Sequence, residues 1–549
     1  MNQDEAPEFI FISQSNPVNY AQYSRLPIGR IELFDELIFP RMVYFQGGFH
    51  SYVDVLNYFQ YGSFYQDASY SQRREMLNIW DLPGFNSIHV SSVLKAAGVA
   101  VAVINNVDSE WDHLDAFLTV AGTTPLVGLS TTFHLSFSEA QRVIQRVRQV
   151  RPDAVFVLGG AFINEQMINQ GVASFEAVMR RYGIDYLLFG MNSENDLFDL
   201  ILCRRERRSL AGVANLAYFE HISGKTDKIF RVTATRWREP VLETPFAAGK
   251  IQLSSNGKTI QMRTSYGCPF DCEFCSYPQT AGKFVMLDAE TVERQVEAAL
   301  TIYGARRVVF IDDTFNAPLK RFIEICRRLA SLNIEWFCFL RGNLINEESA
   351  LLMREAGCRG VYLGIESAND GVLRNMNKRA TVRQFFDGVA ALKKHGIITI
   401  GAFIIGFPGE TDATIEDDVR FIETSGLDFY TLKEFYYMPH TPIHQKRELY
   451  GLTGTANRWS HATMDYPAAH RKKIEMFIKI KGSVFIDPDT NLWHLAYLYD
   501  QGFDFARISA IQQQINAVVM NQIRGNMDDN HPGFRAIAAM LAQEEYERS

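Results

Sequence analysis

Apolar positions follow two different periods along the first part of the chain. Short apolar runs predict buried strands, and segments whose apolar residues recur at helical spacing predict helices. The predicted strands are residues 8–13, 99–104, 125–130, 154–158 and 186–189. Residues 88–97 are a predicted helix, and Ser138 is the predicted N-cap of another that carries Ile144 and Val147. This order is typical of a doubly wound parallel sheet, a Rossmann-like α/β domain.

The segment between the first strand and residue 88 breaks this order because it is rich in aromatic residues. Its rings include Tyr58, Phe59, Tyr61, Phe64, Tyr65 and Tyr70. Such a segment can form a lid over a site or a small satellite core, and the packing preference of aromatic rings favours the core. Residues 212–250 lose the helical period, which is typical of a linker with short strands.

A second series of strands and helices begins at Thr259. Its predicted strands continue at residues 307–311, 335–340, 360–365 and 397–405. The predicted helices are residues 319–332, residues 382–395 and a helix capped by Asp288. This alternation predicts a partial (β/α)6 TIM-type barrel, whose chemistry belongs at the carboxyl ends of its strands. Helical stretches from Ala468 and Leu492 predict a helical C-terminal cap.

These patterns divide the chain into several units. We expect an α/β domain over residues 1–205, a linker over 206–255, a barrel over 256–435 and a helical cap over 436–549. Several cores are expected because single domains stop growing near about 250–300 residues, and this chain has 549.

Charge and hydropathy exclude some classes of function. The net charge of −8 disfavours nonspecific binding to nucleic acid, which depends on Lys and Arg neutralising phosphates. No apolar run approaches the roughly 20 residues that a membrane span requires. The N-terminus carries acidic residues and no basic region ahead of an apolar stretch, which argues against a secretory signal. We therefore expect a cytoplasmic protein.

The strongest motif is a cluster of cysteines. Cys268, Cys272 and Cys275 have the spacing C-x-x-x-C-x-x-C. Thiolates at this spacing can bind one face of a 4Fe-4S cluster and leave the fourth iron without a protein ligand. Structural zinc is the main alternative, but it requires a fourth Cys or His, and the neighbouring sequence offers none. The remaining cysteines fall in helix or strand patterns typical of plain buried thiols: Cys203, Cys326, Cys338 and Cys358.

This motif, with Phe274 before its third cysteine, resembles that of the radical S-adenosylmethionine (SAM) superfamily. The resemblance implies that the open iron binds the methionine part of SAM, that SAM cleavage gives a 5'-deoxyadenosyl radical, and that Phe274 packs near the adenine. Later segments match the family in order, and they imply further SAM contacts. These residues are Asp312, Asp313, Arg341, Glu366, Ser367, Gly406 and Glu410. Taken singly, such acids are more often solvated or helix caps, and Arg341 could equally pair with an acid.

The first 205 residues resemble the cobalamin-binding domain that precedes the radical domain in one branch of the superfamily. The resemblance implies a cobalamin crevice formed by Asn16, Ser130, Thr131, Thr132, Gly159, Gly160, Gly190 and Glu194. On spacing alone, simple strand-to-helix turns are the favoured interpretation of these glycines. No D-x-H-x-x-G sequence follows the first strand, so the sequence indicates no histidine ligand to cobalt. Some members of this branch bind no cobalamin.

Two histidines are candidates for a catalytic role. His440 stands where relatives usually have glycine in Pro-Gly-Thr-Pro, and His461 lies in a loop that resembles one found in some members. Ordinary hydrogen-bonded histidines are more common than catalytic ones. No residue is therefore assigned to catalysis.

Together these features predict a cobalamin-dependent radical SAM methyltransferase. We expect it to methylate an unactivated carbon, or less readily phosphorus, of a small-molecule or peptide substrate from secondary metabolism. A low-potential donor such as flavodoxin or ferredoxin would supply electrons. One alternative is a radical SAM cyclase or carbon–carbon coupling enzyme that makes no use of methylcobalamin. A corrinoid or redox sensor is an alternative of another class, although the sequence shows no DNA-binding element.

Overall fold

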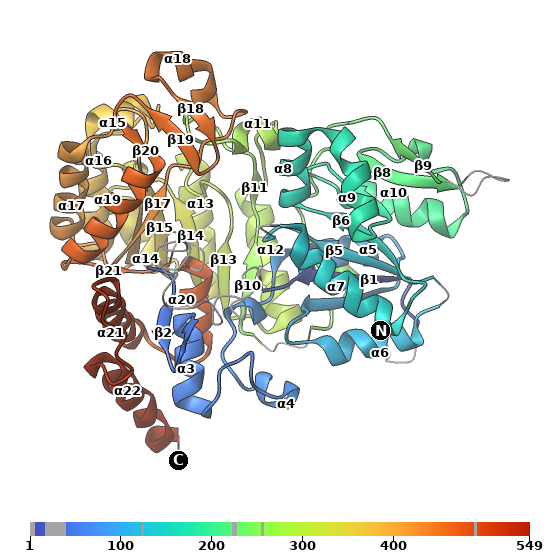
Figure 1. Ribbon diagram of the computed structural model, residues 1–549, viewed down its shortest axis with the longest axis horizontal. Coiled ribbons are helices and arrows are strands. Elements are labelled where there is room, and N and C mark those ends of the chain that lie inside the picture. The colour runs from blue at the N-terminus through green and yellow to red at the C-terminus, as the bar shows by residue number, and fades with distance from the viewer. Residues whose placement is uncertain are drawn as a thin grey trace.

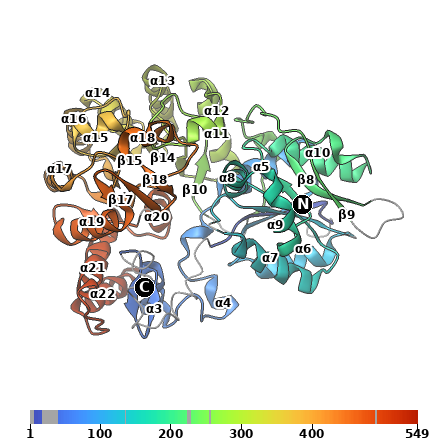
Figure 2. The ribbon, with the colours of Figure 1, turned by 45° about the horizontal axis from the view of Figure 1, so that its top comes forward.

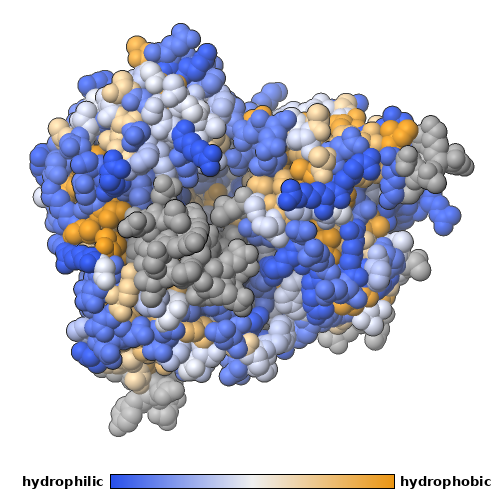
Figure 3. Space-filling view, viewed as in Figure 1, coloured by the Kyte–Doolittle hydropathy of each residue, from blue (hydrophilic) through white to orange (hydrophobic). Residues whose placement is uncertain are grey.

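A computed structural model describes residues 6–16, 40–122, 124–134, 136–221, 228–253, 257–487 and 491–548. Its two large sheets lie side by side (Figure 1). The N-terminal sheet, blue to green, lies to the right of the barrel, which runs from yellow-green to orange. The surface is largely hydrophilic and is notched between the two halves at the top of Figure 3.

The N-terminal sheet confirms the predicted α/β class. It has seven strands in the order β4-β1-β5-β6-β7-β8-β9, and those from β4 to β7 run parallel. The strands are β1 (Phe9–Gln14), β4 (Val101–Asn106), β5 (Leu126–Ser130), β6 (Val155–Gly159), β7 (Tyr186–Leu188), β8 (Leu216–His221) and β9 (Lys228–Val232). The helices are α5 (Phe85–Ala96), α6 (Trp111–Val120), α7 (Phe137–Val150), α8 (Ala161–Gln170), α9 (Phe175–Tyr182) and α10 (Glu194–Arg205). The short strands expected in the linker are β8 and β9, which extend this sheet antiparallel.

One helix begins earlier than predicted. The N-cap of α7 is Ser136, and the prediction of Ser138 was wrong. The Ser136 side chain accepts a hydrogen bond from the backbone of Ser138, and the Glu139 side chain reaches back to the N-cap backbone. Serine followed three residues later by glutamate is a capping box, which satisfies helix N–H groups from both sides.

The second sheet confirms the predicted parallel barrel. Its seven strands follow the order β10-β13-β14-β15-β16-β17-β21 and all pair in parallel. The strands are β10 (Thr259–Met262), β13 (Arg307–Phe310), β14 (Glu335–Leu340), β15 (Cys358–Glu366), β16 (Ile398–Ile405), β17 (Phe429–Glu434) and β21 (Val484–Phe485). The helices are α12 (Ala289–Tyr303), α13 (Leu319–Leu329), α14 (Glu347–Glu355), α15 (Asp370–Asn375), α16 (Val382–Lys394) and α17 (Asp412–Thr424). As predicted, Asp288 caps α12.

The cysteine motif leaves the barrel between its first two strands. A small hairpin of β11 (Ser265–Tyr266) and β12 (Val285–Met286) flanks it, and helix α11 (Tyr277–Ala281) follows the last cysteine. In Figure 1, β11 and α11 lie at the boundary between the two sheets.

The C-terminal region combines helices with short strands. Its helices are α18 (Arg447–Tyr450), α19 (Tyr466–Lys479), α20 (Asn491–Asp500), α21 (Phe505–Ile523) and α22 (Pro532–Arg548). A small sheet of β18 (Thr453–Thr455), β19 (Arg458–His461) and β20 (Met464–Asp465) precedes α19. The strand β21 then pairs with β17, so part of this region extends the barrel sheet.

The first part of the aromatic insertion packs against the C-terminal helices, away from the N-terminal sheet. It contains β2 (Val43–Phe45), β3 (Gly48–His50), α3 (Tyr52–Tyr61) and α4 (Tyr70–Arg73). The ring centroids of Phe45 and Phe534 are 4.4 Å apart, and Gln522 hydrogen-bonds both the N–H and the C=O of Tyr44. Figures 1 and 2 both show α3 beside α21 and α22. The predicted satellite core was wrong, because Phe64 belongs to the apolar core of the barrel half and Tyr58 and Phe59 pack against that core.

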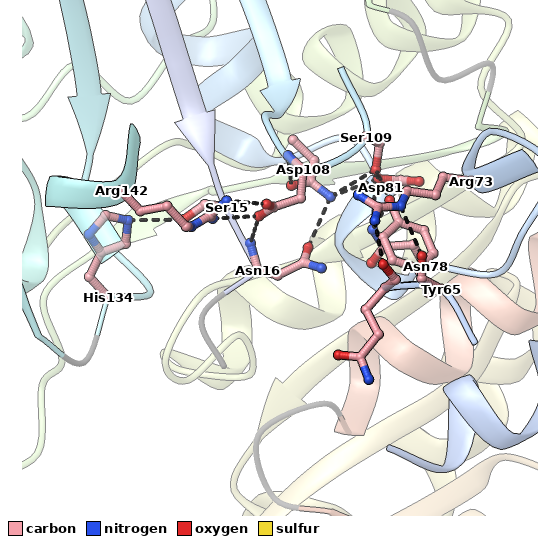
Figure 4. Close-up of polar contacts among 12 residues, drawn as sticks. Ser15, Asn16, Tyr65, Arg73, Asn78, Asp81, Asp108, Ser109, His134 and Arg142 are labelled. Carbon is pink, nitrogen blue, oxygen red and sulfur yellow. Dashed lines mark hydrogen bonds and ion pairs between the residues drawn. The ribbon is translucent and has the colours of Figure 1, made fainter. Parts of the chain in front are cut away.

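A polar network fastens the end of this insertion to the N-terminal sheet (Figure 4). Asp81 accepts hydrogen bonds from the Ser109 hydroxyl and, at 2.8 Å, from the side-chain amide of Asn106, the last residue of β4. The hydroxyl groups of Tyr65 and Ser109 are 2.9 Å apart. This carboxylate therefore connects two parts of the chain that pack in different cores.

Of the helices in the described ranges, none is long and apolar enough to cross a membrane.

Candidate functional site

A cavity of about 370 Å³, here called the interdomain cavity, lies between the two sheets. The N-terminal sheet contributes residues at the carboxyl ends of β5 and β6, together with Glu194 at the start of α10. The strand-end residues are Ser130, Thr132, Gly159 and Gly160. The barrel half contributes Gln261, Arg263 and Asp313. Strand ends of parallel sheets are the usual ligand sites of such folds. Here the strand ends of both sheets border one space.

A second cavity of about 290 Å³, the cysteine cavity, lies at the mouth of the barrel. Its walls contain all three motif cysteines, together with Phe274, Asp312, Asp313, Arg341, Glu366 and Lys378. Residues that end different barrel strands therefore converge on the cysteine loop. Most of the residues predicted to contact SAM lie around this space.

The two cavities adjoin each other. Tyr277, Ile311, Asp313 and Trp493 border both of them. Tyr277 opens α11 directly after the cysteine motif, Asp313 follows β13, and Trp493 comes from α20 of the C-terminal region. Ligands in the two cavities would therefore be separated by little more than one layer of side chains.

The surroundings of the three cysteine thiols are suited to holding an iron–sulfur cluster. Arg341 donates from Nη1 to the Cys272 sulfur at 3.5 Å, and the Cys268 sulfur lies 3.6 Å from the Thr314 hydroxyl. Burial raises the pKa of Cys275 to about 12, so its thiolate form needs added positive charge nearby. In the described ranges no three Cys, His, Asp or Glu side chains surround a single-ion position. In an iron–sulfur cube, by contrast, each thiolate binds a different iron atom.

Glu366 ends β15 in an unusual backbone conformation. Its φ of +70° lies in the left-handed region, at a register shift between β15 and β16. Its carboxylate accepts a hydrogen bond from Lys378 Nζ at 2.9 Å, and both side chains are nearly buried. Lys378 Nζ also lies 5.7 Å from the centroid of the Phe274 ring. A strained residue with a buried charge at a cavity wall is typical of a functional position.

The neighbouring acids Asp312 and Asp313 have different surroundings. Asp312 accepts hydrogen bonds from the backbone N–H of Thr264 at 3.0 Å and from the hydroxyl of Ser265. It therefore fixes the strand that leads into the cysteine loop. Asp313 borders both cavities, and burial raises its pKa to about 6, although Arg263 opposes the shift.

Three predicted SAM contacts lie away from the residues that line the cysteine cavity. Ser367 donates its hydroxyl to Asp418 at 3.2 Å, and the backbone N–H of Gly406 donates to Glu410. Burial raises the pKa of Glu410 well above its usual value, and the charge of Asp418 adds to the shift. In this structure these groups brace the loops behind the cavity wall.

Three predicted cobalamin contacts also lie outside the interdomain cavity lining. Thr131 donates its N–H and its hydroxyl to the carbonyl of Gly159. A Cβ at Gly190 would lie 2.9 Å from the Asn215 amide nitrogen, so this glycine allows close packing. Asn16 donates its backbone N–H to Asp108 at 2.9 Å.

Neither candidate histidine borders a described cavity. His461 stacks on Trp459 and lies 2.9 Å from the carbonyl oxygen of Gly406, which is a bracing contact. His440 Nδ1 is buried without a hydrogen-bond partner in the described ranges, and burial lowers the pKa of this imidazole. No histidine is among the described residues that line the interdomain cavity.

Sequence reasoning missed several residues of the cavity walls: Arg263, Tyr277, Lys378 and Trp493. Tyr277 comes two residues after Cys275, and this closeness could have identified it. Lys378 and Trp493 carry no such signal, because only the segment between α15 and α16 and the position of α20 bring them to the site.

Comparisons with known proteins agree with this architecture. The pattern of the Radical SAM superfamily matches residues 262–422. An uncharacterized methyltransferase of Pyrococcus horikoshii is 29% identical over 62% of this chain and 73% of its own length. The anaerobic magnesium-protoporphyrin IX monomethyl ester cyclase of Rubrivivax gelatinosus is 25% identical over 56% of each chain. This chain thus spans little more than half of the second relative.

Solved structures extend the likeness to almost the whole chain. The radical SAM methyltransferase TsrM from Kitasatospora setae, solved with tryptophan and a SAM analogue, aligns over 99% of this chain and 100% of its own, with 16% identity and a TM-score of 0.54. OxsB, a cobalamin-dependent SAM radical enzyme, aligns over 99% and 81%, with 13% identity and a TM-score of 0.54. At such identities the likeness establishes the fold. Residues 262–422 therefore match the Radical SAM superfamily, and the chain as a whole has the fold of the radical SAM enzymes TsrM and OxsB.

Proposed function

We propose that this protein is a cobalamin-dependent radical SAM methyltransferase that acts on an unactivated carbon of a small molecule. The observation that supports this most directly is the shared wall of the two cavities, formed by Tyr277, Ile311, Asp313 and Trp493. Methyl transfer requires the methyl donor and the radical source to reach the same substrate atom, and adjoining cavities meet that requirement.

Cys268, Cys272 and Cys275 would hold the 4Fe-4S cluster, with SAM beside it along the walls of the cysteine cavity. When bound, the cluster and SAM supply a radical able to abstract hydrogen, and cobalamin supplies the methyl group. Arg341 keeps a positive charge against the Cys272 sulfur. The buried pair of Glu366 and Lys378 presents both charges to the space where the polar groups of SAM would lie.

The interdomain cavity would hold the corrin ring against the carboxyl ends of β5 and β6. Small groups line this edge, namely the Ser130 and Thr132 hydroxyls and the backbone of Gly159 and Gly160. Gly160 has a φ of +120°, and a Cβ there would lie 3.0 Å from the Thr132 nitrogen. The turn therefore favours glycine at this position, and no side chain projects from it. We propose that no protein histidine binds cobalt, since none lines this cavity in the described ranges.

We further propose that the protein works in the cytoplasm, where thiols stay reduced, and accepts electrons from a donor such as flavodoxin or ferredoxin. Methylation of carbon is favoured over methylation of phosphorus. The substrate would come from secondary metabolism.

The relative named as a cyclase favours a second candidate function. In that case the same fold would close a ring or join carbons without using methylcobalamin. Anaerobic reconstitution with SAM, with and without methylcobalamin, distinguishes the two. The methyltransferase retains corrin stoichiometrically and forms a methylated product only with methylcobalamin. A cyclase forms 5'-deoxyadenosine and its product equally in both mixtures, and that result would exclude our first proposal.

A further inference from the structure

A row of aromatic rings crosses the boundary between the two cavities. The ring centroids of Trp80 and Phe133 are 5.4 Å apart, and those of Phe133 and Trp493 are 6.3 Å apart. The row continues from Trp493 to Phe339 at 5.4 Å and from Phe339 to Tyr362 at 5.3 Å. Phe133 and Trp493 border the interdomain cavity, and Trp493, Phe339 and Tyr362 border the cysteine cavity.

These rings come from separate parts of the chain. Trp80 belongs to the aromatic insertion, Phe133 follows β5, Phe339 and Tyr362 lie on barrel strands, and Trp493 lies on α20. A narrow slot of about 20 Å³ opens between the first part of this row and the loops around it, and Trp80, Phe133 and Trp493 line this slot as well. Trp493 is thus part of the lining of all three spaces.

Trp493 also has an unsatisfied polar atom. Its indole Nε1 is shielded from solvent and has no hydrogen-bond partner in the described part of the chain. A buried donor without an acceptor costs free energy, so native structures rarely keep one without a reason. An acceptor on a bound molecule would remove this cost.

We propose that this row, centred on Trp493, is the substrate subsite and that it binds a flat, conjugated ring carrying a hydrogen-bond acceptor. The proposal rests on the methyltransferase function, because it places the ring between the two cofactor cavities. Aromatic faces prefer other π systems to saturated rings of equal size, and edge-to-face neighbours such as Phe133 hold the ring in one orientation. The subsite therefore selects flat substrates.

Two neutral probes test this selection. Coumarin and octahydrocoumarin share the same bicyclic lactone and carbonyl acceptor, but only coumarin is flat and conjugated. Binding is measured by ligand-observed NMR on anaerobically reconstituted protein, with SAM and cobalamin present so that their sites are filled. The wild-type protein should bind coumarin roughly threefold to tenfold more tightly than octahydrocoumarin.

Variants of Trp493 assign the preference to this ring. Trp493→Leu should make the affinities for coumarin and octahydrocoumarin nearly equal. Trp493→Phe keeps an aromatic face and should retain most of the preference for coumarin. Trp237→Leu is the matched control, since Trp237 is 48% exposed and lines none of these cavities. If Trp493→Leu does not fold, Phe133→Leu removes the neighbouring ring and should lower the same preference.

Equal binding of both probes by the wild type would overturn the proposal, as would absence of binding up to ~10 mM. A preference that survives in both leucine variants would overturn it too. The same samples test the methyltransferase function separately, through corrin absorbance and 5'-deoxyadenosine formation. Protein that retains no corrin but still prefers coumarin would refute the function and leave the flat-ring subsite supported.

Discussion

Lys378 Nζ lies 2.9 Å from a carboxylate oxygen of Glu366 at the wall of the cysteine cavity. Glu366 ends β15 at a register shift, and Lys378 lies just after α15, where the backbone N–H of Glu273 in the cysteine loop donates a hydrogen bond to the Met376 carbonyl. The pair is nearly buried, so neither charge can be removed without leaving the other poorly solvated. This buried ion pair both supports the loop and presents charge to the cavity.

Glu366→Gln should weaken SAM binding about tenfold, because the charge-assisted hydrogen bond proposed between the Glu366 carboxylate and the polar groups of SAM becomes a neutral one. Glu366→Ala should also lower the melting temperature, since Lys378 is left buried and unpaired. Calorimetric titration of reconstituted protein with SAM and anaerobic thermal unfolding measure the two effects. Glu335→Gln, in an ion pair with Arg307 at the other end of the barrel strands, is the control that should leave SAM binding unchanged. Unaltered SAM affinity in Glu366→Gln would contradict a role in binding.

Alanine at Cys268, Cys272 or Cys275 should abolish the iron–sulfur chromophore and the formation of 5'-deoxyadenosine, because the cluster loses one of its protein ligands. Iron and sulfide analysis with visible absorbance checks the first effect, and chromatography checks the second. Cys203→Ala is a matched control, since Cys203 is a buried free thiol on α10. A triple alanine variant that still cleaved SAM would exclude a cluster at this motif.

Thr132→Trp should fill part of the interdomain cavity and prevent corrin binding, whereas the cysteine cavity stays intact. We expect cobalamin content to fall below about one tenth of the wild-type value, with 5'-deoxyadenosine formation retained. Thr119→Trp, on the exposed face of α6, controls for the added indole. Full retention of corrin by Thr132→Trp would contradict the proposed location. Thr132 is preferable to Gly160 for this test, because any side chain at a φ of +120° would strain the turn.

Asp81 should make stability depend on pH. Burial raises the pKa of this carboxyl from 3.8 to about 6, despite hydrogen bonds from Ser109 and Asn106. The folded state therefore holds its proton up to a higher pH than the unfolded state does, and stability falls as pH rises between about 4 and 6. Asp81→Asn removes this loss. The melting temperature of Asp81→Asn minus that of the wild type should therefore be more positive at pH 8 than at pH 4.

Thermal unfolding of reconstituted protein at the two pH values checks this. Asp115→Asn is the control, since Asp115 lies in a partly exposed ion pair with Arg146. A difference between Asp81→Asn and wild type that does not change with pH would show that the Asp81 carboxyl is not held protonated by burial.

The sequence predicted most strands because a buried parallel strand is a short apolar run, and such runs need no tertiary information. The predicted strand over residues 335–340 coincides with β14, and β1, β5 and β16 differ by one or two residues. Asp288 was found because N-caps are local. The Ser136 cap was missed although its signal, Glu139 three residues on, is equally local.

The aromatic insertion shows where such reasoning fails. Some of its rings, such as Phe64, pack in a core as expected, but nothing local indicates which core. The insertion packs against α21 and α22, which lie more than 400 residues further along the chain. It buries more apolar surface there than it could bury in a small core formed by the insertion alone.

The sequence by itself indicated the chemistry, because the cysteine spacing predicted to bind a cluster and the order of strand-end motifs are properties of one continuous chain. It could not separate wall residues such as Asp313 and Glu366 from bracing residues such as Ser367 and Glu410. The tertiary structure alone decided that the two sets of strand ends adjoin, that Lys378 reaches the cysteine cavity and that Trp493 borders both cavities. The physical reason is that these positions depend on how whole sheets and helices pack, and packing joins residues that are far apart in sequence.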